Sequence, residues 1–426
     1  MKTANTFIAE YKLSSETINI QEIVEDFISE MSEGLSSGEG SLRMIPTYIE
    51  ADNEFLIEVP VVAIDAGGTN FRVATVRFNS SGALEISNLE HAKMPGLKGE
   101  ISREEFFNEM AGYVKNHVAE CDRIGFCFSY ATEIYPNKDG KLIKFSKEVQ
   151  APEVEGEMIG ANLLQALGTP EKAIVLLNDT VATLLAGKSE AFGKEYDSYI
   201  GYILGTGTNT CYIEKNANIT KNKELDPAGS MIINIESGNF SKAPRTEIDI
   251  EFDSTTATPG QYTFEKMFSG GYFGGLCLQA LKTAAAEGVF TDATASKITN
   301  LDQLTAEEAN LYVTDGDNRG PLNDLLATPQ DHQSCELIIN SLIGRSATLV
   351  AANIAAVILK TEKGKESDKP ILITVEGTTF YKMHGLQAEF ETRLSGFLSG
   401  ERKRYYEFTE VKQSSLVGAA LSALIN

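Results

Sequence analysis

The sequence has no tryptophan, and its five cysteines form no CxxC pair. An odd set of cysteines without paired spacing argues against a disulfide framework and a zinc site, so we expect reduced thiols and a cytoplasmic protein. No stretch approaches roughly 18 uninterrupted apolar residues, and the N-terminus lacks a charged region followed by a sustained apolar run. We therefore expect a chain that is neither exported nor membrane-spanning.

Basic residues are also scarce, because 37 Lys and Arg stand against 60 Asp and Glu, for a formal net charge of −23. Without a concentrated basic patch, a surface that follows nucleic-acid phosphates is excluded. The length of 426 residues exceeds what one hydrophobic core usually serves, so two or more domains are expected.

Strand and helix patterns alternate along the chain, which predicts an α/β protein, and a long apolar helix is expected from about Cys335 to Lys360. Residues 61–78, VVAIDAGGTNFRVATVRF, consist of a buried strand, a glycine turn and a second β-rich run. Residues 199–213, YIGYILGTGTNTCYI, repeat this arrangement, so the same hairpin is expected twice. The repeat indicates an internal duplication.

Both glycine turns are candidate phosphate-binding sites. Asp65 ends the first strand, and Gly67 and Gly68 let backbone N–H groups approach an anion; Gly205 and Gly207 do the same in the second turn. Either turn alone is explained as well by the conformational needs of a hairpin. Two such turns, one with an acid at the strand end, favour a polyphosphate held between two lobes.

Asn178 and Asp179 end the apolar strand AIVLLNDT just before a predicted helix. Ligands bind at the carboxyl ends of strands in α/β sheets, and a carboxylate that takes a hydroxyl proton suits phosphoryl transfer. Asp179 is therefore our candidate catalytic base. The alternative is that the pair only caps the helix.

DAGGTNFRVATV resembles the first phosphate motif of hexokinases and glucokinases, which belong to the actin-like ATPase superfamily. Further blocks resemble that family in its own order, from about residue 61 to 425. They are GFCFSYATEI, LIKFSKEVQAPEVEGE, VLLNDTVATLLAG, GTGTNTCYIE, INIESGNF, PGQYTFEKMFSGGYFGGL and VEGTTFYKM. Several ordered blocks are much more specific than one motif.

The resemblance implies a sugar site of carboxylate, amide and hydroxyl groups, with Asn234 as a weaker candidate. Such a site selects a polyol, because it binds neighbouring hydroxyl groups and rejects analogues that lack them. The implied sugar residues are Ser129, Ser146, Lys147, Asn178, Asp179, Asn209, Glu236 and Glu265.

The resemblance also implies an ATP site in which Lys147, in preference to Arg72, acts as the catalytic residue that stabilises charge on the transferring phosphate, and Asp65 holds Mg²⁺ through water. Some positions depart from the family pattern: Glu376 replaces an aspartate, SSLVGAA replaces the last glycine-rich turn, and Ser237 replaces a tryptophan. The implied ATP residues are Asp65, Gly67, Gly68, Thr69, Asn70, Arg72, Gly205, Thr206, Gly207, Thr208, Gly377, Thr378 and Gly418.

We therefore expect a two-lobed actin-like ATPase (ribonuclease H-like) fold with mixed sheets and an interlobe cleft. The expected small lobe comprises residues 55–180 and 412–426, and the large lobe residues 1–54 and 181–411. The expected function is transfer of the γ-phosphate of ATP to the 6-hydroxyl of a hexose, with Mg²⁺ and no nucleic-acid or membrane partner, by a monomer or homodimer. The alternatives are a sugar sensor without turnover and a chaperone-like or filament-forming ATPase.

Overall fold

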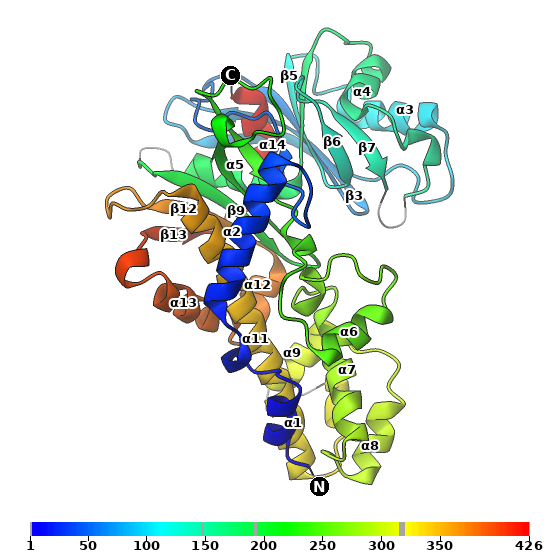
Figure 1. The fold of residues 1–426 in the computed structure, drawn as a ribbon. Helices are drawn as coiled ribbons and strands as arrows, with labels where there is room; N and C mark the ends of the chain where they lie inside the picture. Colours follow the sequence, from blue (N-terminus) through cyan, green and yellow to red (C-terminus); the bar gives the residue numbers. More distant parts are fainter. Residues whose placement is uncertain (1, 146–148, 191–193, 315–319, 426) are drawn as a thin grey trace.

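The computed structural model describes residues 2–145, 149–190, 194–314 and 320–425 (Figure 1). Its two main sheets lie in different parts of the molecule and have separate hydrophobic clusters on their outer faces. A third cluster lies where the two parts meet and draws residues from both sheets. The predicted mixed α/β architecture is confirmed.

The smaller sheet is built around the first glycine-turn hairpin. Its strand order is β4 (Leu84–Lys93), β3 (Asn70–Phe78), β2 (Val61–Gly67), β5 (Arg123–Phe128) and β8 (Ala173–Leu177). β2 pairs antiparallel with β3 and parallel with β5, which pairs parallel with β8. Residues of α3 (Arg103–Val114) and α4 (Ile159–Leu167) join the hydrophobic cluster on one face, and the hairpin of β6 (Ala131–Ile134) and β7 (Gly140–Lys144) follows β5.

The larger sheet repeats this topology around the second hairpin. Its strand order is β1 (Ile45–Pro46), β11 (Ser230–Asn234), β10 (Thr208–Lys215), β9 (Ser198–Leu204), β12 (Ile371–Glu376) and β13 (Tyr406–Thr409). If β1 is left aside and the five strands of each sheet are numbered by their order in the sequence, both sheets have the same spatial order, 3-2-1-4-5. The predicted repeat of the hairpin is confirmed and extends to the whole strand order.

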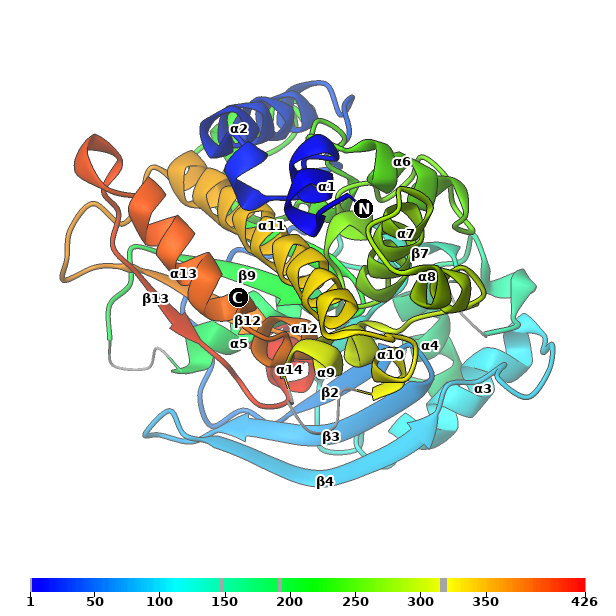
Figure 2. The same ribbon diagram turned by 90° about the horizontal axis from the view of Figure 1, so that it is seen from below.

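The long helix α11 (Pro329–Thr361) forms the centre of the larger lobe. Three further helices lie along it: α1 (Ala4–Glu10), α2 (Ile20–Ser36) and α13 (Leu386–Phe397) (Figure 2). The sequence predicted its start at Cys335, but it begins six residues earlier because Thr328 caps its N-terminus and Pro329 suits the first turn. By length and composition α11 would be able to cross a membrane, but it is mostly buried inside the protein.

Shorter helices extend the larger lobe away from its sheet (Figure 1). They are α6 (Glu247–Ser254), α7 (Phe273–Ala286), α8 (Asp292–Thr299), α9 (Ala306–Thr314) and α10 (Gly320–Asn323). α12 (Thr378–Lys382) follows β12 directly and leads toward α13.

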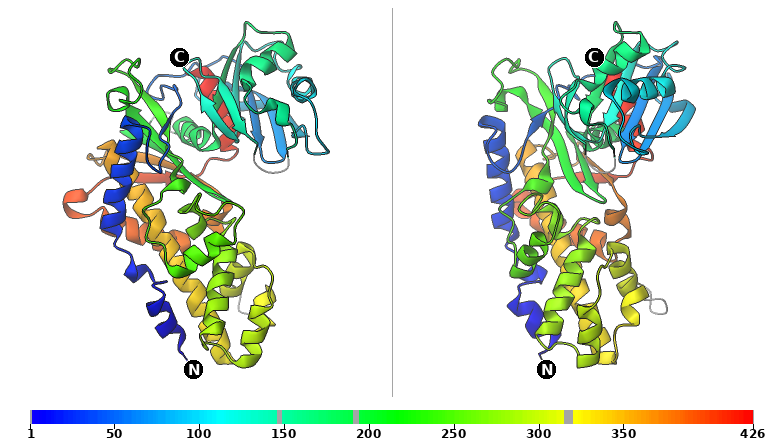
Figure 3. Two further views of the ribbon diagram at one scale, coloured as in Figure 1. Left: turned by 45° about the vertical axis from the view of Figure 1, so that its right-hand side comes forward. Right: turned by 90° about the vertical axis from the view of Figure 1, so that its right-hand side faces the viewer.

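Two helices cross between the sheets. α5 (Asp179–Glu190) follows the smaller sheet's last strand but packs against β9 and β12, whereas α14 (Ser414–Leu424) follows β13 but packs against β2 and β5 (Figure 3). The two helices also pack against each other, and a Cβ atom at Gly418 would overlap the backbone of Ala182. The exact lobe boundaries given above remain a prediction.

Candidate active site

A pocket of about 740 Å³ lies between the two sheets. The smaller sheet and its connections contribute Ser129 and Asn178, and the larger sheet and its connections contribute Asn234, Glu236 and Glu265. The structure thus brings together four predicted sugar residues and the weaker candidate from distant parts of the sequence.

Asn178 and Asp179 stand where β8 ends and α5 begins. Asn178 Oδ1 and Asp179 Oδ1 both accept a hydrogen bond from the backbone N–H of Thr180, at 2.8 and 2.7 Å. The capping interpretation is therefore correct for the local geometry, and Asn178 lines the pocket as well. The charge of Asp179 adds to the effect of burial in raising the pKa of both Glu236 and Glu376.

Asn209 and Asn234 orient the carboxylate of Glu236. Asn209 Nδ2 donates to Asn234 Oδ1 at 2.7 Å and to Glu236 Oε1 at 3.3 Å, and Asn234 Nδ2 donates to Glu236 Oε1 at 2.9 Å. Glu236 has a left-handed backbone conformation with φ 59°, which costs a non-glycine residue about 1–3 kcal/mol. Burial raises the pKa of Glu236, while the amide donors oppose this shift.

Glu265 connects the sugar pocket to the second glycine turn. Its Oε2 atom accepts a hydrogen bond from the Thr208 backbone N–H at 2.8 Å. A Cβ atom at Gly207 would lie 2.7 Å from the same oxygen, so this turn needs glycine to let the carboxylate approach. Burial raises the pKa of Glu265 to about 7.

The first glycine turn joins β2 to β3 and places Asp65 at its base. Arg72 Nε donates to Asp65 Oδ2 at 2.8 Å, and a second guanidinium nitrogen contacts the same oxygen. Arg72 is thus held by Asp65 rather than extended into the cleft. The carbonyl of Gly68, which has φ 62°, accepts a hydrogen bond from Tyr130 Oη at 2.6 Å.

The second glycine turn contacts two other segments of the larger lobe. The Gly205 carbonyl accepts from Gly270 N and from Thr379 Oγ1, both at 2.8 Å, and the Thr206 carbonyl accepts from Gly271 N at 2.8 Å. Gly377 has φ 123°, and a Cβ atom there would overlap the backbone of the β9 end. Gly377 therefore lies beside the second turn and Thr378 follows it, and their contact with ATP stays a prediction.

Gly418 is placed differently. It lies in the middle of α14 against Ala182 of α5, so close helix packing accounts for the glycine. Its nucleotide role stays a prediction that this environment does not support.

Two departures from the family pattern contact each other. Ser414 Oγ at the start of α14 donates to Glu376 Oε2 at the end of β12, and Thr183 Oγ1 donates to the same oxygen at 3.1 Å. The longer glutamate side chain reaches a hydroxyl group that a glycine would not supply. Burial and the charge of Asp179 raise the pKa of Glu376.

Some site residues were missed by sequence reasoning, and two predicted ones lie outside the described residues. Arg43, Gln261 and Tyr262 line the pocket; Gln261 and Tyr262 belong to the same family-like block as Glu265, which was a signal for them, whereas no motif marks Arg43. Ser146 and Lys147 fall in the segment 146–148, for which the structure gives no description.

The described residues include no group of three or more His, Cys, Asp or Glu side chains arranged to hold a metal ion. A single carboxylate with water and substrate phosphates is, however, the arrangement that Mg²⁺ commonly accepts. Asp65, beside the first turn, fits that requirement.

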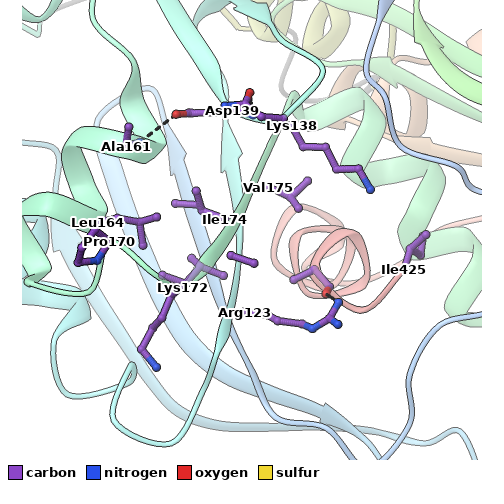
Figure 4. Close-up of a pocket in the computed structure, with 14 residues that line it drawn as sticks. Arg123, Lys138, Asp139, Ala161, Leu164, Pro170, Lys172, Ile174, Val175 and Ile425 are labelled. Carbon is purple, nitrogen blue, oxygen red and sulfur yellow. Dashed lines mark hydrogen bonds between the residues drawn. The ribbon is translucent and has the colours of Figure 1, made fainter. Parts of the chain in front are cut away.

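A second pocket, of about 470 Å³, lies between β8, α4 and the end of α14 (Figure 4). Its polar groups bond within the protein: Asp139 accepts from Ala161 N at 2.9 Å, Arg123 donates to the Ala423 carbonyl at 3.2 Å, and Lys172 donates to the Cys121 carbonyl at 2.8 Å. No predicted site residue that the structure describes lines it, so the interlobe pocket is the candidate active site.

Comparison with known families gives two matches that together cover most of the chain. Residues 199–425 match one family profile and residues 3–189 match another, and both are described as hexokinase.

Similar curated proteins include Hexokinase-7 of Oryza sativa subsp. japonica, which is 30% identical over 92% of this chain and 90% of its own length. Hexokinase-1 of Schizosaccharomyces pombe is 29% identical over 88% of this chain and 80% of its own length. A solved hexokinase from Schistosoma mansoni, complexed with glucose, covers 99% of this chain and 100% of its own, with a TM-score of 0.76 and 20% identity. At that identity the structural likeness shows the two-lobed actin-like ATPase fold.

Proposed function

The chain belongs to the hexokinase family, and we propose that it transfers the γ-phosphate of ATP to the 6-hydroxyl group of glucose or a related hexose. The observation that carries this proposal is the interlobe pocket, in which carboxylates and amides from both lobes meet beside the two glycine turns. Such a pocket offers many hydrogen bonds to neighbouring hydroxyl groups.

The sugar is proposed to bind between Ser129 and Asn178 on one side and Asn209, Glu236 and Glu265 on the other. Ionised carboxylates accept two or more hydroxyl hydrogen bonds, so Glu236 and Glu265 suit adjacent ring hydroxyls. Hydroxyl donors of the bound sugar would also stabilise the ionised form of both carboxylates.

Asp179 is proposed as the general base. As the sugar oxygen attacks the γ-phosphorus, its proton passes to Asp179 while the bond from phosphorus to the ADP oxygen breaks. The position supports this role, because Asp179 directly follows the pocket residue Asn178 and its carboxylate is held at the start of α5 by the Thr180 N–H. Ser146 and Lys147 are also proposed to contact the sugar. Lys147 is proposed to contact the transferring phosphate as well.

ATP is proposed to place its phosphates between the two glycine turns, near the backbone N–H groups of residues 67–70 and 205–208. Asp65 would hold Mg²⁺ through water, and the ion would neutralise charge on the phosphates. Gly377 and Thr378 beside the second turn are proposed to contact the rest of the nucleotide.

We also propose a cytoplasmic location, without a nucleic-acid or membrane partner. All five cysteines are free and buried, which agrees with a reducing compartment. The chain is proposed to act as a monomer or homodimer.

A sugar sensor without turnover is the second candidate. The contact between Glu376 and Ser414 favours it, because serines fill the start of α14 where the family carries a glycine-rich turn near the nucleotide. The retained Asp179 and both phosphate turns favour the kinase.

The test is ADP release from ATP and Mg²⁺ with glucose, mannose, fructose or glucosamine, for the parent chain and for Asp179→Asn. We expect one sugar to stimulate release, and Asp179→Asn to lower kcat about 10²- to 10⁴-fold while the sugar still binds. Asp122→Asn, at an exposed aspartate on the far side of the smaller lobe, is the matched control and should leave kcat unchanged. Sugar binding to a parent chain that releases no ADP would establish the sensor instead.

A further inference from the structure

Asn353 is a polar residue in an apolar part of α11. Its side chain is fully buried, as are its neighbours Ala352 and Ile354. Its Oδ1 atom has no hydrogen-bond partner among the described residues. A buried amide oxygen without a partner lowers stability, so folding stability alone does not account for an asparagine at this position.

The amide nitrogen of Asn353 begins a buried chain of hydrogen bonds. Nδ2 donates to Thr210 Oγ1 at 2.9 Å, and Thr210 Oγ1 lies 3.1 Å from Ser237 Oγ. Either hydroxyl can be the donor in this second contact, because Thr210 Oγ1 has one more lone pair besides the one that accepts from Asn353. Thr210 and Ser237 are both fully buried.

This series of hydrogen bonds ends at the proposed sugar ligands. Thr210 N and Ser237 N both donate to Asn209 Oδ1, at 2.7 and 3.2 Å. Since the carbonyl side of the Asn209 amide is held in this way, its Nδ2 atom points to Asn234 and Glu236. Ser237 also directly follows Glu236, whose left-handed backbone needs support from its neighbours.

The residue at 237 departs from the family pattern in the same place. The family carries a tryptophan after the sugar-binding glutamate, whereas this chain has a serine. The serine hydroxyl contacts Thr210 Oγ1, which in turn accepts from Asn353, and an indole ring would not offer this contact.

We infer that Asn353 is a positioning residue for the sugar site, acting through Thr210 and Ser237 on Asn209 and Glu236. The inference rests on the proposed function, because it requires those two residues to bind the hexose. The role is specific to the sugar side, since the chain of hydrogen bonds reaches neither glycine turn through its side chains.

The test compares Asn353→Ala, Thr210→Val, Thr210→Ser and the double variant Asn353→Ala/Thr210→Val in the full chain. Glucose affinity is measured by titration calorimetry, and the KM values for glucose and ATP by ADP release. One buried hydrogen bond contributes about 1 kcal/mol, so we expect Asn353→Ala and Thr210→Val each to weaken glucose binding about 5- to 10-fold, with the KM for ATP unchanged within twofold. Thr210→Ser keeps the hydroxyl group and should retain affinity.

The double variant should lose no more glucose affinity than the single variant with the larger loss, because both changes break the same series of hydrogen bonds. Thr348→Val is the matched control: Thr348 is buried in the same helix, but among the described residues its hydroxyl bonds with the Gly344 carbonyl alone. It should lower thermal stability without changing glucose affinity. If Asn353→Ala does not fold, Thr210→Val carries the test, because valine keeps the shape of threonine.

Unchanged glucose affinity in folded Asn353→Ala and Thr210→Val would overturn the inference, as would an equal rise in both KM values. If the parent chain itself neither binds a hexose nor releases ADP, the proposed function fails and the inference with it. That outcome is distinguishable because it appears before any substitution is made.

Discussion

Burial raises the pKa of Glu265 to about 7, from an ordinary value of 4.5, so this carboxyl changes charge within the usual range of enzyme assays. Thr208 N–H and Lys266 favour its charged form, while Glu236 opposes it. Below the pKa, Glu265 is protonated and accepts fewer sugar hydroxyl groups.

Glucose affinity should therefore fall as the pH is lowered through 7. If only the ionised form binds well, affinity at pH 6 is about tenfold below that at pH 8. Calorimetric titrations at a series of pH values measure this directly.

Glu265→Gln is the control for this pH dependence. The amide has nearly the same shape but does not titrate, so the variant should bind glucose weakly at every pH, with a flatter profile than the parent. Equal slopes for the parent and the variant would assign the pH dependence to another group, such as Glu236.

At the same scale, sequence reasoning found the groups that stand at strand ends and turns, such as Ser129 and Asn178. It missed Arg43 and Tyr262, which reach the pocket from irregular segments before β1 and before the short helical turn at Glu265–Met267. Periodicity carries no information about where such segments fold back. The hydrogen bond of Asn353 with Thr210 was equally beyond prediction, because 143 residues separate them.

Among the secondary structure elements, the contact between α5 and α14 depends on Gly418. A Cβ atom there would overlap the Ala182 backbone, which cannot move aside as a flexible side chain would. Inserting atoms into a well-packed contact typically costs about 1–3 kcal/mol.

Gly418→Ala should therefore lower the free energy of unfolding by about 3 kcal/mol, at the upper end of that range. Urea denaturation followed by circular dichroism measures the change.

Gly112→Ala is the matched control, because Gly112 lies exposed in α3 with open space at its Cβ position. That change should stabilise the protein by about 0.5–1 kcal/mol through the better helix propensity of alanine. Equal effects of the two substitutions would refute the packing role of Gly418.

The sequence predicted both glycine-turn hairpins and the apolar character of α11, because these features depend on local sequence patterns. Local patterns do not show which sheet α5 and α14 cover, and the expected lobes, which place residues 412–426 with the smaller sheet and residues 181–411 with the larger one, follow from the family resemblance alone. A helix pattern shows an apolar stripe but does not identify its partner. Gly418 was accordingly assigned to the nucleotide, although helix packing accounts for it.

At the scale of the whole molecule, the smaller sheet depends on a helix from the far end of the described chain. Residues of α14 form a hydrophobic cluster with β2, β3 and α5. Removal of residues 412–426 would expose this cluster to water.

The truncated chain should lose protection from hydrogen exchange in β2 and β5 while β9 and β12 keep theirs. Mass spectrometry of exchanged peptides compares the two sheets in one experiment, so the larger sheet serves as the internal control. Equal loss in both sheets would show that the lobes fold as one cooperative unit.

The two-lobed fold itself was predictable because ordered motif blocks along the chain resembled one family. The lobe limits were drawn from the same resemblance, and they stay a prediction that the truncation experiment addresses.

The position of α14 also has a consequence for biosynthesis. The ribosome makes this helix after every strand of both sheets, and domains generally fold as they are completed during translation. The nascent smaller lobe therefore lacks α14 until the whole larger lobe has been made, and the side of β2 and β5 that α14 covers stays exposed during that time. During that interval the unfinished chain presents an apolar surface to chaperones, and a stalled ribosome would leave it there.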